Sequence, residues 1–230
     1  MNAHHDTTPR ADSLWVIARR RDTAIALAAA LALAGCANIE RSRDVGNPDV
    51  AGRTLAMQVC SNCHGVDGNS ISPNFPRLAG QPAPYIAMQL KSFRAHQRRD
   101  PSGFEYMWGL SRKLTDAQID SIAVYFQDSA PTANPAGSGP RAGAGKSIFE
   151  RGVPDEHVPA CTTCHGENAQ GRDGFPRLAG QHADYVRKQL DVFQRTEGRP
   201  EGAVMKAVAH ELKPQEIVAV ADYVQGMAVR

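Results

Sequence analysis

The sequence carries little net charge and has no basic patch that would suggest binding to nucleic acid. Its 26 lysines and arginines are nearly balanced by 24 aspartates and glutamates, giving a formal net charge of +2 over 230 residues. Because binding to a nucleic-acid backbone requires a basic face, this composition argues against nucleic acid as a partner. The sequence also lacks stretches in which polar and apolar residues alternate, so we expect little β-sheet.

Hydrophobic runs are short. The run from Thr23 to Ala34 is too short to span a bilayer as a stable helix, but it follows three arginines, as in an export signal. It leads into Leu33-Ala34-Gly35-Cys36, which resembles the lipobox of bacterial lipoproteins. We therefore expect an export signal of lipoprotein type at residues 1–35, a lipid on Cys36, and a tether at 36–49 that anchors the protein to a membrane surface on the periplasmic side. Secretory cleavage after Ala34 is the alternative, and it would give a soluble periplasmic protein.

Cysteine is scarce, and four of the five cysteines fall in two copies of one pattern. These are Cys60-Ser61-Asn62-Cys63-His64 and Cys161-Thr162-Thr163-Cys164-His165. C-x-x-C-H is typical of c-type haem attachment, in which both thiols bond covalently to the haem and the histidine binds its iron. The sequence thus predicts two haem c groups, with His64 and His165 as axial ligands, and a role in electron transfer.

A zinc site and a redox dithiol are two other uses of paired cysteines. A zinc site built from both pairs would have to gather residues about 100 positions apart around one ion, whereas such pairs usually enclose roughly 15 to 20 residues. A redox dithiol needs a βαβ context and gives no reason for a histidine after each second cysteine. Both explain the pattern less well than haem attachment.

A longer repeat surrounds the cysteine motifs. Phe75-Pro76-Arg77-Leu78-Ala79-Gly80-Gln81 recurs unchanged at residues 175–181, so the chain is a tandem duplication. Residues 130–144, rich in proline and glycine, cannot sustain a helix or strand and are predicted to link the copies. We expect domains at 50–129 and 145–230, each so small that a haem would fill much of its core.

Local patterns predict an all-α fold. Apolar residues with helical spacing follow Thr115, which forms a potential capping box with Gln118, and a similar apolar stripe follows Pro214. Two further helices are expected around residues 85–93 and 185–193, and one before each cysteine motif.

The sixth iron ligand in each domain is predicted to be a methionine. Met107 and Met205 each lie seven residues before a leucine, on the segment expected to be a loop entering the last helix. His210 is the rival in the second domain, but the matching position in the first is Arg112. The other histidines between residues 50 and 230 that lie outside the motifs, His96, His157 and His182, are expected at the surface. A soft thioether favours ferrous iron and raises the potential relative to a second imidazole. With both axial positions filled there is no open site for oxygen, so the protein is predicted to carry electrons and not to be an enzyme.

Together, the C-x-x-C-H-G sites, the paired P-R-L-A-G-Q segments and the methionine-to-leucine spacing resemble the dihaem cytochrome c4 family over residues 50–227. The resemblance implies two tandem cytochrome c domains, each wrapped around one haem. It also implies that the carbonyls of Pro76 and Pro176 orient the two histidines, and that Arg77 and Arg177 hold haem propionates.

Three functions fit these features. The first is a shuttle from a quinol-oxidising complex to a terminal oxidase, the second is the cytochrome subunit of a periplasmic dehydrogenase, and the third is a haem-based ligand sensor. The second repeat has extra residues around 152–159 before its motif. This difference between the repeats could give the two haems different redox partners. A redox protein is the expected partner in the first two cases.

Overall fold

The structure is a computed structural model that describes residues 41–195 and 197–229. Residues Arg43–Arg230 form one compact unit, which contains both copies of the repeat. The predicted export signal and Cys36 lie outside the described residues. Across the described ranges, no helix combines the length and the apolar character needed to cross a membrane.

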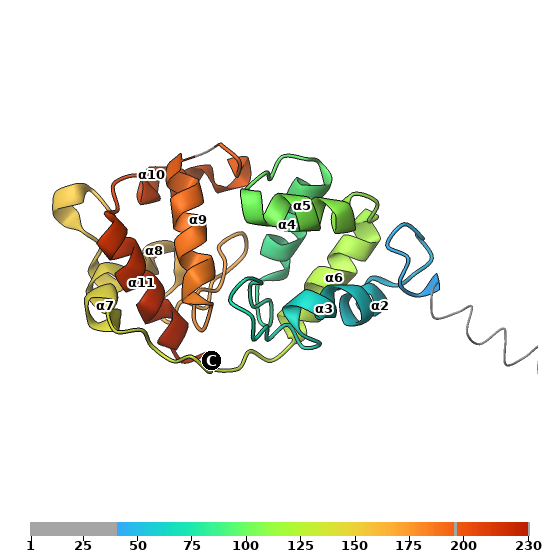
Figure 1. The fold of residues 1–230 in the computed structure, drawn as a ribbon, viewed down its shortest axis with the longest axis horizontal. Coiled ribbons are helices and arrows are strands. Elements are labelled where there is room, and N and C mark those ends of the chain that lie inside the picture. The colour runs from blue at the N-terminus through green and yellow to red at the C-terminus, as the bar shows by residue number, and fades with distance from the viewer. Residues whose placement is uncertain (1–40, 196, 230) are drawn as a thin grey trace, which may run out of the picture. The chain divides into compact units, whose positions relative to one another are not determined.

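The first copy of the repeat is built from short and medium helices (Figure 1). In chain order these are α2 (Gly52–Leu55), the π-helix η1 (Ala56–Cys60), α3 (Ser61–His64), α4 (Ala83–Arg94), α5 (Pro101–Ser111) and α6 (Asp116–Asp128). The cysteine motif therefore begins at the end of η1 and continues into α3.

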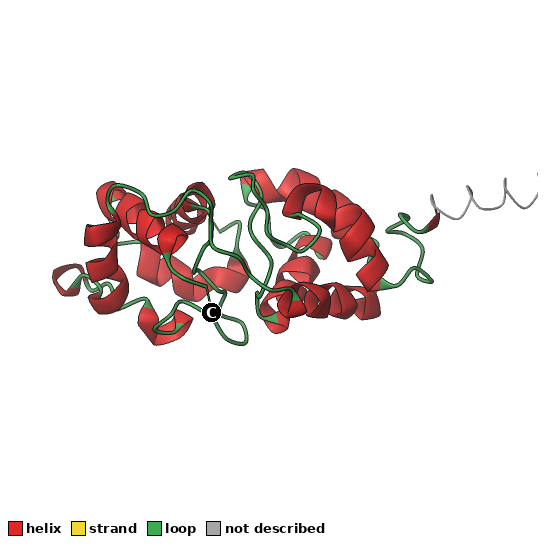
Figure 2. Cartoon of the chain, turned by 90° about the horizontal axis from the view of Figure 1, so that it is seen from below, coloured by secondary structure: helices red, strands yellow, loops and turns green. Residues whose placement is uncertain are grey.

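The second copy follows the same order after a helix-free segment. Its helices are α7 (Ala142–Arg151), the 3-10 helix η2 (Pro154–Glu156), α8 (Thr162–His165), α9 (Ala183–Arg195), the 3-10 helix η3 (Pro200–Gly202), α10 (Ala203–Ala209) and α11 (Pro214–Gly226). Helices and loops make up the described chain, with only two isolated bridges, Val153 with Val158 and Arg172 with Phe175 (Figure 2). The prediction of an all-α fold is confirmed.

Local sequence signals explain where the last helix of each copy begins. The Thr115 hydroxyl accepts a hydrogen bond from Gln118 N at 3.2 Å, and Gln118 Oε1 accepts one from Thr115 N at 2.9 Å. This is the predicted capping box, and it satisfies donors that a helix start leaves free. In the second copy, Pro214 is the first residue of α11, where a missing N–H costs nothing.

Each copy has its own apolar core. The core of the first includes Leu55, Ile119 and Phe126, all with 0% of their surface exposed, and that of the second includes Phe149 and Val224, also at 0%. The two clusters share no residue. Each half therefore buries its own hydrophobic surface.

A glycine lets the first helix of each copy approach the last. In the first copy Gly52 of α2 lies so close to α6 that a Cβ would collide with Gln118 O. In the second, a Cβ on Gly145 of α7 would collide with Ala219 O of α11. These glycines permit backbone contact that any larger residue would prevent.

Three expectations about local structure were wrong. The segment 130–144, predicted to contain no helix, includes the start of α7 at Ala142, because the apolar face of α7 packs into the core of the second copy. Met107 and Met205 lie within helices, α5 and α10, instead of on loops. A proline in the first turn of α5 starts that helix early enough to include Met107. His182 is not a surface residue, since only 4% of it is exposed, because Ser70 of the first copy and Asn134 of the linker contact its ring.

Candidate functional site

The histidine of the first motif is held by a backbone carbonyl. Helix α3 ends at His64, which is buried, and the chain turns at Gly65 with a φ of +83°, a conformation that favours glycine. His64 Nδ1 lies 2.9 Å from Pro76 O. Because a carbonyl can only accept, Nδ1 must carry the proton, and Nε2 keeps the lone pair with which imidazole binds a metal.

The second motif repeats this geometry. Helix α8 ends at the buried His165, Gly166 again has a φ of +83°, and His165 Nδ1 lies 2.9 Å from Pro176 O. Burial lowers the pKa of His64 and of His165, more strongly than the hydrogen bonds to the proline carbonyls raise it. Both imidazoles are therefore neutral near pH 7, the state in which histidine is a ligand.

The four motif cysteines carry free, half-buried thiols. Burial raises the pKa of Cys60 to about 12 and that of Cys161 to about 11. A reactive dithiol needs a thiol whose pKa is lowered, so these environments do not suit dithiol exchange. The zinc alternative needs the two pairs in one place, and no group of three or more metal-binding side chains occurs among the residues that the structure describes.

The two arginines of the repeated segment are buried at the junction between the copies. Arg77 is 1% exposed, and its guanidinium donates to Asn69 Oδ1 at 2.9 Å, to Ser70 O at 3.3 Å and to the carbonyl and hydroxyl of Thr132 at 2.7 Å each. Arg177 is 3% exposed, and its side chain donates to Ala79 O at 3.0 Å, in the other copy, and to Ala179 O. Neither guanidinium has an ion-pair partner among the described acidic residues.

Both arginines have donor atoms left over. Arg77 Nε and Arg177 Nη2 are buried without a hydrogen-bond partner. Burial lowers the pKa of Arg177 to about 10, and the charge of Arg77 adds to the effect. An unpaired buried cation is costly, so this arrangement favours an anion beside it.

A second pair of buried arginines joins the halves, and the sequence reasoning missed it. Arg199 Nη2 donates to Gln89 Oε1 at 2.9 Å, and Arg98 Nη2 donates to Gln189 Oε1 at 3.2 Å, so each arginine reaches the glutamine of the other copy. Arg98 also pairs with Asp100, with its Nε 2.6 Å from Oδ1. The sequence does hold one indication of this pair. Arg98 and Arg199 lie at nearly matching positions in the two copies, five residues after Phe93 and six residues after Phe193.

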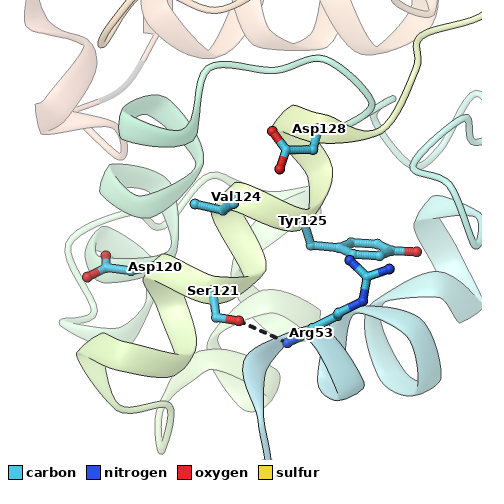
Figure 3. Close-up of a pocket in the computed structure, with 6 residues that line it drawn as sticks. All are labelled: Arg53, Asp120, Ser121, Val124, Tyr125 and Asp128. Atoms are coloured by element: carbon cyan, nitrogen blue, oxygen red, sulfur yellow. Dashed lines mark hydrogen bonds between the residues drawn. The ribbon is translucent and has the colours of Figure 1, made fainter.

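An open pocket on the first copy lies apart from these groups. It is lined by Arg53, Asp120, Ser121, Val124, Tyr125 and Asp128 (Figure 3). The Arg53 guanidinium lies 5.0 Å from the centre of the Tyr125 ring, and the Tyr125 hydroxyl donates to Val66 O at 2.5 Å, which ties α6 to the loop after His64. The pocket is lined by no cysteine or histidine.

Comparison with known proteins agrees with this geometry. The family model for cytochrome c matches residues 50–129 and 142–228, one match in each copy. Cytochrome c4 of Stutzerimonas stutzeri is 37% identical over 215 residues, which cover 88% of this chain and 97% of that protein. The chain belongs to the cytochrome c family, as a dihaem cytochrome c4.

Two further comparisons extend this result. The chain is also similar to the crystal structure of reduced recombinant cytochrome c4 from Pseudomonas stutzeri, with a TM-score of 0.68 and 38% sequence identity. The match covers 80% of this chain and 100% of the chain in that structure. A protein named thiosulfate dehydrogenase electron acceptor, from Stutzerimonas stutzeri strain A1501, is 33% identical over 75% of this chain and 80% of that protein. The chain is thus similar both to cytochromes c4 and to an acceptor for a dehydrogenase.

As a cytochrome c4, the chain binds two haem c groups, one at Cys60 and Cys63 and one at Cys161 and Cys164. Its residues fit such groups. The motif thiols are free, the neighbouring imidazoles are neutral, and the unpaired donors of Arg77 and Arg177 suit carboxylates such as haem propionates.

The structure places each candidate methionine in the half that holds its histidine. Met107 is half-buried against the apolar core of the first copy, and Met205 against that of the second. Their assignment as axial ligands stays a prediction, as do the roles of the two arginines toward propionates.

Proposed function

We propose that this cytochrome c4 works in the periplasm and carries single electrons from a quinol-oxidising complex to a terminal oxidase. Each haem, when bound, supplies one iron that gains and loses a single electron. The observation that carries the proposal is the double site itself, in which two neutral, carbonyl-oriented histidines lie in halves joined by buried hydrogen bonds.

The chain's residues support a carrier because they fix the irons' surroundings. Pro76 and Pro176 hold His64 and His165 in one tautomer and orientation, so little has to rearrange when charge changes. Met107 and Met205 would be the second protein ligands of the two irons, which would leave no open site for oxygen. Arg77 and Arg177 would offset the negative charge of propionates inside the protein.

We also propose that a lipid on Cys36 anchors the protein to a membrane. The support is the sequence Leu33-Ala34-Gly35-Cys36 after a short apolar run. Two or three acyl chains hold a protein firmly at a membrane surface, whereas one gives only marginal binding. Recovery of a Cys36→Ser variant in the soluble periplasmic fraction, with the unaltered protein in the membrane fraction, would support the anchor.

The experiment that tests the route is optical. The purified protein is fully reduced and mixed with membranes that lack it, and haem reoxidation is followed with and without cyanide. Rapid, cyanide-sensitive reoxidation supports donation to a terminal oxidase. Haems that stay reduced would contradict this route.

The second candidate is a cytochrome that accepts electrons from a periplasmic dehydrogenase. The observation that favours it is the similarity to a thiosulfate dehydrogenase electron acceptor over most of both chains. In that case a purified dehydrogenase and its substrate should reduce the oxidised protein. The rate of reduction should be proportional to the concentration of the dehydrogenase. Copurification with a catalytic subunit would point the same way. Carbon monoxide binding to either reduced haem would instead favour a ligand sensor.

A further inference from the structure

One peptide group links the iron-binding histidine of the first half to a side chain of the second. The carbonyl of the Pro76–Arg77 peptide accepts from His64 Nδ1 at 2.9 Å, and the N–H of the same peptide donates to Gln181 Oε1 at 2.8 Å. Gln181 belongs to the second copy of the repeat. A continuous hydrogen-bonded chain therefore runs from His64 across the junction.

The second half contains the reciprocal chain. The carbonyl of the Pro176–Arg177 peptide accepts from His165 Nδ1 at 2.9 Å, and its N–H donates to Gln81 Oε1, in the first copy, at 2.9 Å. The same arrangement therefore occurs in both directions. Each glutamine accepts a hydrogen bond from the peptide that holds the histidine of the opposite half.

Both glutamines are fixed at their other end as well. Gln181 Nε2 donates to Arg77 O at 3.0 Å, and Gln81 Nε2 donates to Arg177 O at 2.8 Å. Only 3% of Gln181 and 2% of Gln81 is exposed, so water does not compete for these contacts. Each amide is therefore held by two bonds in one orientation.

A peptide whose N–H is hydrogen-bonded has a more polarised carbonyl, which is then a stronger acceptor. A stronger acceptor for Nδ1–H makes the imidazole a more basic ligand, and outer hydrogen bonds of this kind tune the metal. A more basic ligand favours ferric iron and lowers the potential.

We propose that Gln81 and Gln181 are crossed positioning residues, each of which lowers the potential of the haem in the opposite half. This inference rests on the proposed function, because it takes His64 and His165 as the iron ligands. It makes the docking of the two halves part of the tuning of each haem.

The test replaces each glutamine with methionine, which has a similar length but lacks the amide. In Gln181→Met the first haem should become easier to reduce, with its ferrous-to-ferric ratio at a fixed potential rising about threefold, or about 30 mV for one electron. The second haem should change much less. Gln81→Met should give the mirror result.

Measurements use the intact protein with both haems. Redox titration gives the two midpoint potentials, which Met107→Ala and Met205→Ala assign to their halves by each displacing one step. Hydrogen exchange of the Arg77 and Arg177 amides gives an independent readout, since losing Gln181 should speed exchange at Arg77 and spare Arg177. Should a methionine variant fail to fold, Gln181→Asn withdraws the amide by one methylene and tests the same contact.

Ser92→Ala is the matched control. It removes a hydrogen bond between the halves, from the Ser92 hydroxyl to Glu201 Oε2 at 3.1 Å. This bond involves neither of the two peptides that accept hydrogen bonds from the histidines. Both potentials should stay within the error of the unaltered protein. A shift like that of Gln181→Met would show that general loosening of the junction is the cause, and would overturn the proposal.

Equal shifts of both haems in each glutamine variant would overturn the proposal, as would shifts confined to the variant's own half or no shift at all. Failure of the ligand assignment is separable. It would appear as Met107→Ala and Met205→Ala leaving both redox steps in place, whatever the glutamine variants do.

Discussion

His182 is a titratable side chain enclosed between the two halves. Its Nε2 lies 2.9 Å from Ser70 O in the first half, and its Nδ1 lies 3.2 Å from Asn134 Nδ2. The carbonyl can only accept, so Nε2 carries the proton, and Nδ1 accepts from the amide. A second proton on Nδ1 would face a donor, so the site is built for the neutral ring.

Stability should therefore fall in acid through His182. Burial lowers its pKa below 6.5, with a smaller contribution from the charge of Arg77, and the hydrogen bond to Ser70 O opposes this. The unfolded chain then binds a proton at a pH where the folded chain does not. This contribution to stability is fully present above about pH 7.5 and is lost as pH falls from about 6.5 through the folded pKa, by about 1.4 kcal/mol per unit of separation. Urea unfolding between pH 5 and pH 8 should show a shallower pH dependence for His182→Gln, and an unchanged slope would contradict the assignment.

The two proposed methionine ligands can be separated from ordinary core residues by substitution. We expect Met107→Ala to leave its haem attached, because both thioether bonds and His64 remain, but to lower that haem's potential and open its iron to carbon monoxide. Met205→Ala should do the same in the second half. Optical titration with carbon monoxide checks both, and a core methionine would instead lose stability with no change in iron ligation.

At the scale of helices, close contact between the first and last helix of each copy depends on a glycine. In α7, Gly145 lies against Ala219 O of α11, while Gly143 of the same helix has nothing within 4 Å of a potential Cβ. Close contact with α11 therefore requires a glycine at position 145, whereas position 143 has room for a side chain.

Gly145→Ala should destabilise the second half by about 1–3 kcal/mol, because the methyl group forces α7 away from α11. Gly143→Ala is the internal control, and it should be neutral or stabilise by up to ~1 kcal/mol through higher helix propensity. Denaturant unfolding monitored by circular dichroism measures both. Equal effects of the two changes would show that helix propensity, and not the helix crossing, governs these positions.

The helices that the sequence predicted best are those whose signals are local. The capping box at Thr115 and the proline at 214 both act within one turn, and both mark real helix starts. The placement of Met107 was harder, because a proline six residues earlier begins a helix where spacing alone suggested a loop. The burial of residues such as His182 and Arg98 could not be predicted, since each contacts a residue of the other copy about 90 to 110 positions away.

For the whole molecule, the halves keep separate apolar cores and meet through polar groups. Arg199 shows how fully the polar groups at the junction are hydrogen-bonded. Its guanidinium reaches Gln89 Oε1 at 2.9 Å, contacts Gln189, and pairs with Glu201, with Nε 3.2 Å from Oε1. With 4% of the Arg199 side chain exposed, these contacts lie where unpaired charge is costly.

Arg199→Met should therefore weaken the junction more than either core. Removing one partner of a buried ion pair costs about 3–5 kcal/mol, because Glu201 loses its cationic partner and the side-chain oxygen of Gln89 loses one of its hydrogen-bond donors. Since each half buries its own apolar surface, we expect the haem-loaded protein to change from one calorimetric unfolding transition to two, with both haems still attached. Arg195→Met is the control, because Arg195 is 76% exposed and lies 4.0 Å from Asp191, so its loss should leave a single transition. A single, uniformly lowered transition in Arg199→Met would mean that the halves unfold together for reasons other than this polar network.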